Sequence, residues 1–161
     1  MAGISVGLLY RHYKTKDDIF MALVQSAIGG LKEVGVIFGG EPLTAIKMWV
    51  TEILGDISKD NEFVNFMHIL SPTFEGYKNH TGRQQMLEAN YIFYNQIADL
   101  ITRGQTDGVF RAGNPLAMAQ FLLTMIGGMC SMKLAISDAF ILPSPSMLTE
   151  FLIKEEYNVY E

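Results

Sequence analysis

The sequence predicts an all-helical fold. Apolar residues recur at helical spacing in most segments, and no segment alternates apolar and polar residues in the way of a half-buried strand. Hydrophobic residues make up 49% and charged residues 18% of the 161-residue chain, so we expect a sizeable core and no long disordered stretch. A short N-terminal unit, residues 1–38, should precede a helical body, residues 39–161.

The first long helix is expected to begin after Thr15, whose hydroxyl is suited to capping a helix N-terminus. Asp18 follows three residues later and completes a capping-box-like pair. Gly29 and Gly30 weaken the second half of this helix, by roughly 1 kcal/mol each relative to alanine. Its apolar face is a regular stripe made of Phe20, Leu23, Val24, Ala27, Ile28, Leu31 and Val34.

A second helix should begin at Pro42, because proline fits the first helical turn, and Gly39–Gly40 separates it from the first. Trp49 lies beside its apolar stripe, which consists of Leu43, Ile46, Val50, Ile53, Leu54 and Ile57. A short apolar segment, residues 63–70, then leads to the breaker Ser71–Pro72, and residues 76–82 are expected to form a loop.

The longest helix is expected at about residues 83–106. One stripe comprises Leu87, Tyr91, Tyr94, Ala98 and Ile101, and it is widened by Met86, Phe93, Ile97 and Leu100. Asn114–Pro115 should start the next helix, which runs to about residue 136. Pro143 and Pro145 separate it from a last helix that carries Met147, Leu148, Phe151, Leu152 and Tyr157.

Residues 116–132 contain no charged side chain. A membrane-spanning helix needs roughly 18 apolar residues, so a span is one interpretation of this run. Gln120, Thr124 and Ser131 interrupt it, and a helix buried on all sides in a homodimer has the same composition. We therefore expect a homodimer interface built from residues 116–136 and 147–157, and no membrane.

Charge is unevenly distributed along the chain. Residues 1–16 hold three basic and no acidic residues, whereas the rest holds nine basic and seventeen acidic residues. A basic end on an acidic body is typical of a protein whose end contacts DNA. Cys130 is the single cysteine and the N-terminus lacks a signal-peptide pattern, so a reducing cytoplasm is the expected location.

A specific sequence signature occupies the first twenty residues. It reads Ala2-Gly3-Ile4-Ser5, then Gly7, Leu9-Tyr10, Tyr13 and Thr15-Lys16, followed by two acids. A turn, a short helix and a long helix resemble the second half of a helix-turn-helix. In detail the segment resembles the recognition-helix signature of TetR-family transcriptional regulators. A softer second match lies in Asp107-Gly108-Val109-Phe110-Arg111 and Asn114-Pro115.

The resemblance implies a DNA-binding unit in residues 1–38 and a ligand-binding and dimerisation domain in residues 39–161. It implies that operator DNA is contacted by Ser5, Val6, Gly7, Tyr10, His12 and Lys16. The family places two further helices before the turn, whereas this sequence starts with Met1 directly at it. We therefore interpret the chain as truncated at its recognition helix, and we expect it to bind operator DNA poorly.

The family resemblance also implies a small hydrophobic ligand that releases a repressor from DNA. We expect it to enter an apolar cavity lined by Trp49, Phe63, Phe66, Met67, Tyr94, Phe121 and Met125. Plain core packing is the alternative for each of these residues, and Cys130 is expected to be a small buried hydrophobic residue. His12, His68 and His80 stand apart and match no catalytic or metal-binding spacing, so we predict no enzyme activity, metal or cofactor.

A second hypothesis for function stays open from the sequence. If the gene product begins at Met1, the chain is a ligand-binding and dimerisation module that does not bind DNA. Codons upstream that encode two amphipathic helices with basic residues would favour the regulator, and a stop codon or ribosome site directly before Met1 would favour the module.

Overall fold

The structure is a computed structural model that describes residues 13–59, 64 and 81–157. Its main elements are α2 (Lys16–Ile37), α3 (Pro42–Lys59), α5 (Thr81–Thr106), α6 (Pro115–Ile136) and the short α7 (Pro145–Thr149). Two single 3₁₀ turns, Ser137–Ala139 and Glu155–Tyr157, follow α6 and α7. The described residues form no strand, and the all-helical fold class predicted from the sequence is confirmed.

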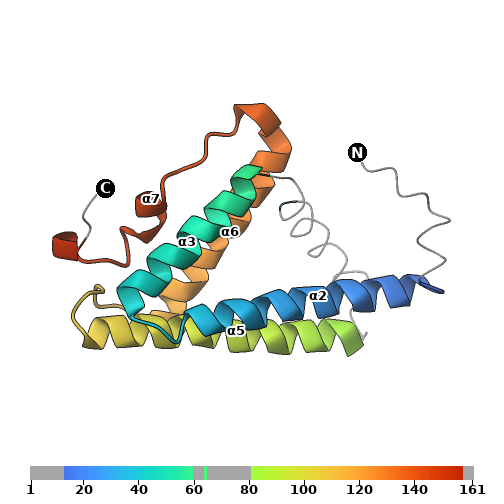
Figure 1. Ribbon diagram of the computed structural model, residues 1–161, viewed down its shortest axis with the longest axis horizontal. Helices are drawn as coiled ribbons and strands as arrows, with labels where there is room; N and C mark the ends of the chain where they lie inside the picture. The colour runs from blue at the N-terminus through green and yellow to red at the C-terminus, as the bar shows by residue number, and fades with distance from the viewer. Residues whose placement is uncertain (1–12, 60–63, 65–80, 158–161) are drawn as a thin grey trace.

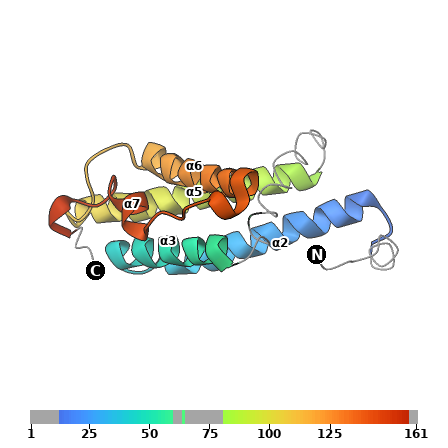
Figure 2. The same cartoon turned by 90° about the horizontal axis from the view of Figure 1, so that it is seen from above.

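Helices α2 and α5 lie side by side and run in the same direction (Figure 1). Side-chain hydrogen bonds agree with this arrangement. Near the N-terminal ends of the two helices, the Gln25 amide donates to the Gln85 side chain (3.1 Å). Near their C-terminal ends, Arg103 of α5 donates to the Gly40 carbonyl oxygen. Helices α3 and α6 both rise from the end of this pair at which α2 and α5 stop, on the left in Figure 1. They overlap in Figure 1, but the view from above separates them, with α7 between (Figure 2).

The start of α2 is the capping box expected from the sequence. The Thr15 backbone N–H donates to the Asp18 carboxylate (2.8 Å), and the Asp18 N–H donates to the Thr15 hydroxyl oxygen (3.1 Å). The Thr15 hydrogen bonds lower the pKa of Asp18. The start of α6 is also as expected, since Asn114 is the N-cap and its side-chain oxygen accepts from the Ala117 N–H (3.0 Å).

Helix α3 starts at Pro42, as predicted, but its cap was not foreseen. The Glu41 carboxylate accepts hydrogen bonds from the backbone N–H groups of Leu43 (2.9 Å) and Thr44 (2.7 Å). Glutamate is not among the residues that usually cap helices through their side chains, so the sequence carries little signal for it. The hydrogen bond with Thr44 is the largest cause of a lowered pKa at Glu41.

Replacing Glu41 with Ala should lower the free energy of unfolding at neutral pH by up to about 1 kcal/mol, because two helix N–H groups lose their acceptor. A carboxyl whose pKa is lowered by folding stabilises the protein above its unfolded-state value, here 4.5, and this contribution is lost as the pH falls through the folded-state value. Urea unfolding at pH 7 measures the loss of stability, and urea unfolding at pH 3 measures how much of it depends on the ionised carboxylate. A difference between wild type and variant that is equally large at both pH values would contradict this account.

The main core lies between α3, α5 and α6 and includes residues from the C-terminal segment. Its largest fully buried side chains are Trp49, Phe110, Ile46, Ile57, Ile97, Leu100, Ile101, Leu122, Leu152 and Ile153. A second, smaller cluster joins α2 to the beginning of α5 and consists of Phe20, Val24, Ala27 and Met86.

The face of α5 that is buried agrees with the expected one only in the second half of the helix. Leu87 and Tyr91, which were placed in the leading apolar stripe, are exposed, Tyr91 by 68%. The buried side chains include all four that were expected only to widen the stripe, Met86, Phe93, Ile97 and Leu100, and two of the leading stripe, Ala98 and Ile101. The two stripes are one residue apart, and packing against α2 and α6 buries the second stripe together with the C-terminal part of the first. Helix α5 also begins at Thr81, so the expected loop at 76–82 extends too far.

The expected last helix begins after Ser144 and carries Met147 and Leu148 as predicted, but its extension to Tyr157 is wrong. Helix α7 ends at Thr149, the chain continues through a turn at residues 150–152, and Ile153 then pairs with Phe110 in an antiparallel bridge. The Arg111 N–H donates to the Leu152 carbonyl (2.7 Å), and the Lys154 N–H donates to the Val109 carbonyl (3.1 Å). These long-range main-chain bonds satisfy groups that a continuous helix would have paired locally, which helical spacing in the sequence could not reveal.

Candidate functional site

Lys16 is the only predicted DNA-contact residue that the structure describes. It is the first residue of α2, its side chain is exposed, and it follows the Thr15–Asp18 capping box. A cation at this position is free to reach a phosphate that approaches the helix N-terminus. Ser5, Val6, Gly7, Tyr10 and His12 lie outside the described residues, so their role in binding DNA stays a prediction.

Trp49 of α3 stands in the middle of an aromatic cluster and is 1% exposed. Its ring meets Phe38 edge-on at 5.2 Å between centroids and Phe93 edge-on at 5.9 Å. Phe38 and Phe93 stack on each other at 5.9 Å. The indole Nε1 is buried and has no hydrogen-bond partner among the described residues, which is costly for a polar donor in a core.

The other predicted ligand-binding residues are only partly brought together. Tyr94 and Met125 are half-buried and pack against the main core. Phe121 is 53% exposed, and its ring packs edge-on against Phe151 at 4.9 Å. Phe63, Phe66 and Met67 lie outside the described residues, so the apolar ligand cavity stays a prediction.

Two residues of this region, Phe38 and Arg103, were not predicted from the sequence. Phe38 follows the last residue of α2, directly before Gly39–Gly40, and an aromatic residue beside a helix-ending glycine pair was the available signal. Arg103 of α5 donates to the carbonyl oxygens of Phe38 and Gly40, the latter at 2.9 Å. These bonds fix the end of α2 to α5, but nothing in the local sequence around Arg103 indicates such distant partners.

Cys130 and the acidic residues form no reactive centre in the described part of the chain. Cys130 is buried in the main core, as predicted, and burial raises the pKa of its thiol. A thiol of this kind is protonated and unreactive at neutral pH. Among the described residues there is no group of three or more His, Cys, Asp or Glu side chains that could hold a metal ion.

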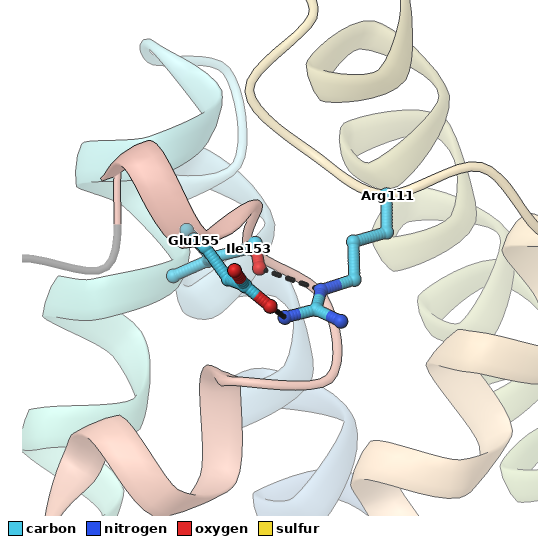
Figure 3. A network of polar contacts seen from close by, with 3 residues as sticks. All are labelled: Arg111, Ile153 and Glu155. Carbon is cyan, nitrogen blue, oxygen red and sulfur yellow. Dashed lines mark hydrogen bonds and ion pairs between the residues drawn. The ribbon is translucent and has the colours of Figure 1, made fainter.

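Arg111 ties the loop after α5 to the C-terminal segment (Figure 3). Its Nε donates to the Ile153 carbonyl (2.9 Å), and its Nη2 lies 3.9 Å from the Glu155 carboxylate. Arg111, Lys154, Glu155 and Glu156 line a shallow surface hollow at this point. The ion pair is solvent-exposed and adds little stability, so the main-chain bond is the principal contribution of Arg111.

In the described part of the chain, the exposed face of α6 and the segment after it carry several large apolar side chains, with Gln120, Thr124 and Ser131 among them on α6. The large apolar side chains are Leu116, Phe121, Met132, Ile136, Ile141 and Met147, with Ile141 88% and Met147 66% exposed. The span Pro115–Ala139 is long and apolar enough to cross a membrane by length and composition, with a mean hydropathy of 1.4. Only 22% of that stretch is buried within the chain, and the same composition is found in core helices of soluble proteins.

The comparisons with known proteins concern the fold. No family model matches the sequence, and no curated protein matches it. A solved structure, that of the MbdR regulator from Azoarcus sp. CIB, is similar, with a TM-score of 0.67 and 19% sequence identity. The match covers 91% of this chain and 77% of that one. The chain therefore shares the all-helical fold of a protein described as a regulator.

Proposed function

We propose that the chain is a ligand-responsive, DNA-binding transcriptional regulator of the TetR family, acting as a repressor that a small hydrophobic molecule releases. The observation that carries this proposal is the fold likeness to a regulator over 91% of the chain. The recognition-helix signature in residues 2–20 supports it independently, because its last part, Thr15 to Asp18, is the capped start of α2.

The DNA-binding part of the proposal assigns Lys16 to a phosphate. Replacing Lys16 with Ala should weaken binding to all duplexes about equally and lower the salt dependence of affinity by about one ion, since a phosphate contact carries no sequence information. Lys32 is exposed near the other end of the same helix, so Lys32→Ala is the matched control and should change neither quantity. Fluorescence anisotropy at several salt concentrations measures the affinity and its salt dependence.

The test of the function itself is selection from a random duplex library. It uses the chain as written and the same chain extended by any residues that its gene encodes before Met1. Recovery of a palindromic consensus by the extended protein supports the regulator. If neither protein enriches any sequence at low salt, DNA binding is rejected and the ligand-binding and dimerisation module becomes the better account.

The ligand part rests on the surroundings of Trp49. The Phe38 ring, directly after α2, meets rings from α3 and α5 there, and the sequence adds Phe63, Phe66 and Met67 as further apolar residues of the proposed pocket. Pockets for small hydrophobic molecules are lined in this way, with few polar groups that fix orientation. Because Trp49 is the only tryptophan, its fluorescence reports on binding at this site.

The homodimer is proposed to form through the exposed apolar face of α6 and the segment after it. Monomeric soluble proteins rarely expose large apolar patches, and the same face on a second copy would cover these side chains. Helix α6 has no charged residue before Lys133, so two copies can approach without burying an unpaired charge.

Replacing Met132, which is exposed on this face, with Glu should weaken dimer formation at least tenfold, because a carboxylate would lose its hydration in an apolar interface. Leu87→Glu is the control, since Leu87 is comparably exposed on α5 and lies away from the face. Sedimentation velocity over a concentration series measures the association. A wild-type chain that stays monomeric at micromolar concentration would refute the homodimer.

A further inference from the structure

Lys133 occupies an inward-facing position near the end of α6. The buried residues of this helix follow one another at helical spacing and are Ala119, Leu122, Ile126 and Cys130. Lys133 comes three residues after Cys130, so it continues the same stripe at a position where another apolar residue would be expected. It is half-buried there. Lysine is rarely buried unless its charge has a partner, so the surroundings of this amine need an explanation.

The partner of Lys133 in the described part of the chain is a main-chain oxygen. Its Nζ donates to the Ile57 carbonyl in the last turn of α3. Burial raises the pKa of the Cys130 thiol, and the nearby charge of Lys133 partly offsets this rise, so the amine lies close to the main core. No carboxylate among the described residues forms an ion pair with it. An ammonium group has three N–H donors and a full charge, which one carbonyl oxygen satisfies only in part.

A second incompletely paired donor lies on α3. Trp49 is about two helical turns, or about 12 Å, before Ile57 along this helix. Both residues are fully buried in the main core, and the Trp49 Nε1 has no hydrogen-bond partner among the described residues. The incompletely paired polar groups along this stretch, Nε1 and the Lys133 amine, are both donors. A molecule that binds here is therefore expected to bring acceptors, and negative charge at the end near Lys133.

The region between α3 and α6 depends on side chains more than on close backbone packing. The backbones of α3 and α6 approach each other less closely than those of α5 and α6, and α7 lies between them (Figure 2). Met125 and Met129 of α6 are half-buried and pack against the main core. Methionine side chains are flexible and fit themselves to irregular apolar partners, so this part of the core is suited to rearranging around an apolar molecule.

We propose that the ligand of the helical body is an apolar carboxylate, whose negative end is held by Lys133 and whose apolar part extends along α3 toward Trp49. The carboxylate supplies the acceptors and the charge that the Ile57 carbonyl provides only in part. Attraction between opposite charges is stronger in the low dielectric of a core than in water. The inference rests on the proposed function, because it names the chemical class of the hydrophobic ligand proposed there.

The test compares molecules that share an apolar chain and differ in the head group. Isothermal titration calorimetry of the full chain uses decanoate, decanamide and decyltrimethylammonium, each below the concentration at which it forms micelles. We expect decanoate to bind about tenfold more tightly than decanamide, because a hydrogen bond to a charged group is stronger than a neutral one. Decyltrimethylammonium should bind more weakly than either. An affinity for decanoate that is no higher than for decanamide, or no binding of decanoate, would overturn the inference.

Replacing Lys133 with Met, which keeps the apolar stem of the side chain and removes the charge, should abolish the preference for decanoate over decanamide. Lys47→Met is the matched control, because Lys47 also donates to a main-chain carbonyl, that of Tyr157 (3.5 Å), but lies toward the other end of α3. It should keep the full preference. The preference is a ratio measured within one variant, so a partly unfolded fraction affects both ligands equally.

A cation at the C-terminal end of a helix also stabilises that helix, so Lys133 has a possible structural role at the end of α3. That role alone predicts a less stable Lys133→Met chain with an unchanged preference, and this result would overturn the inference. Equal losses of preference in the two variants would also overturn it, since general attraction of anions would explain both. Equal binding of decanamide and decanoate would leave a hydrophobic ligand site in place, and the DNA-selection experiment involves no ligand. Failure of this inference and failure of the proposed function are therefore distinct.

Discussion

Replacement of Trp49 by Ala should lower the free energy of unfolding by about 3–5 kcal/mol, the range for removing a large aromatic side chain from a packed core. Trp49 is fully buried and contacts the rings of Phe38 and Phe93, which come from the end of α2 and from α5. The variant leaves both rings without their common partner. The loss should therefore separate α3 from α5 and loosen the attachment of α2.

Urea unfolding followed by circular dichroism measures this effect, because the variant has no tryptophan. Met48→Ala is the control, since the neighbouring Met48 side chain is exposed and surface substitutions usually change stability by no more than about 0.5 kcal/mol. Trp49→Phe should cost much less than Trp49→Ala, because it keeps an aromatic ring and removes a buried N–H that has no partner in the described part of the chain. A loss below about 1 kcal/mol for Trp49→Ala would show that the surrounding cluster is loosely packed.

Helix starts were the most predictable feature of this chain. Side-chain oxygens of Thr15 and Asn114 accept from backbone N–H groups three residues later, and Pro42 has no N–H that needs a partner. The information that sets these helix starts is therefore local. The ends of α2 and α3 are different. Arg103 donates to carbonyls at the end of α2, and Lys133 donates to the Ile57 carbonyl at the end of α3, from residues more than sixty positions away. Such partners leave no trace in the local sequence.

The register of α5 shows why an apolar stripe does not decide which face is buried. Leu87 and Tyr91 have the spacing of a core stripe, yet they are exposed, whereas Met86 and Phe93 beside them are buried. Rotation of the helix by about one residue position would interchange these residues, and the contacts of α5 with α2 and α6 fix its orientation. The same limit applies to the predicted ligand site, where Trp49 is in the core but Phe121 is on the exposed face of α6.

The C-terminal segment shows a second limit. Met147, Leu148, Phe151 and Leu152 have helical spacing, but the helix ends at Thr149 because the following residues pair with the loop after α5. Leu152 and Ile153 are fully buried there, next to Phe110. The resemblance in residues 107–115 marked that loop as a specific segment, although it did not reveal the main-chain partner.

Gly104→Ala should destabilise the protein by about 2–3 kcal/mol, although alanine is the better helix former. Gly104 is buried in the last turns of α5, and its carbonyl oxygen accepts hydrogen bonds from the N–H groups of both Val109 and Phe110 (2.9 Å each). This turn, in which Gly108 has a positive φ of 78°, folds the Phe110 ring back onto Gly104. An added Cβ would lie 2.1 Å from Cδ2 of that ring.

The overlap has no inexpensive relief, because Phe110 is 1% exposed and packed into the main core, so its ring cannot swing into solvent. A double-mutant cycle with Phe110→Ala separates the overlap from other effects of Gly104→Ala. Phe110→Ala alone should cost about 3–5 kcal/mol. In that background Gly104→Ala should be neutral or stabilising by up to about 1 kcal/mol, because only helix propensity remains. If urea unfolding shows that the two substitutions are additive, the ring of Phe110 is not what excludes a side chain at position 104.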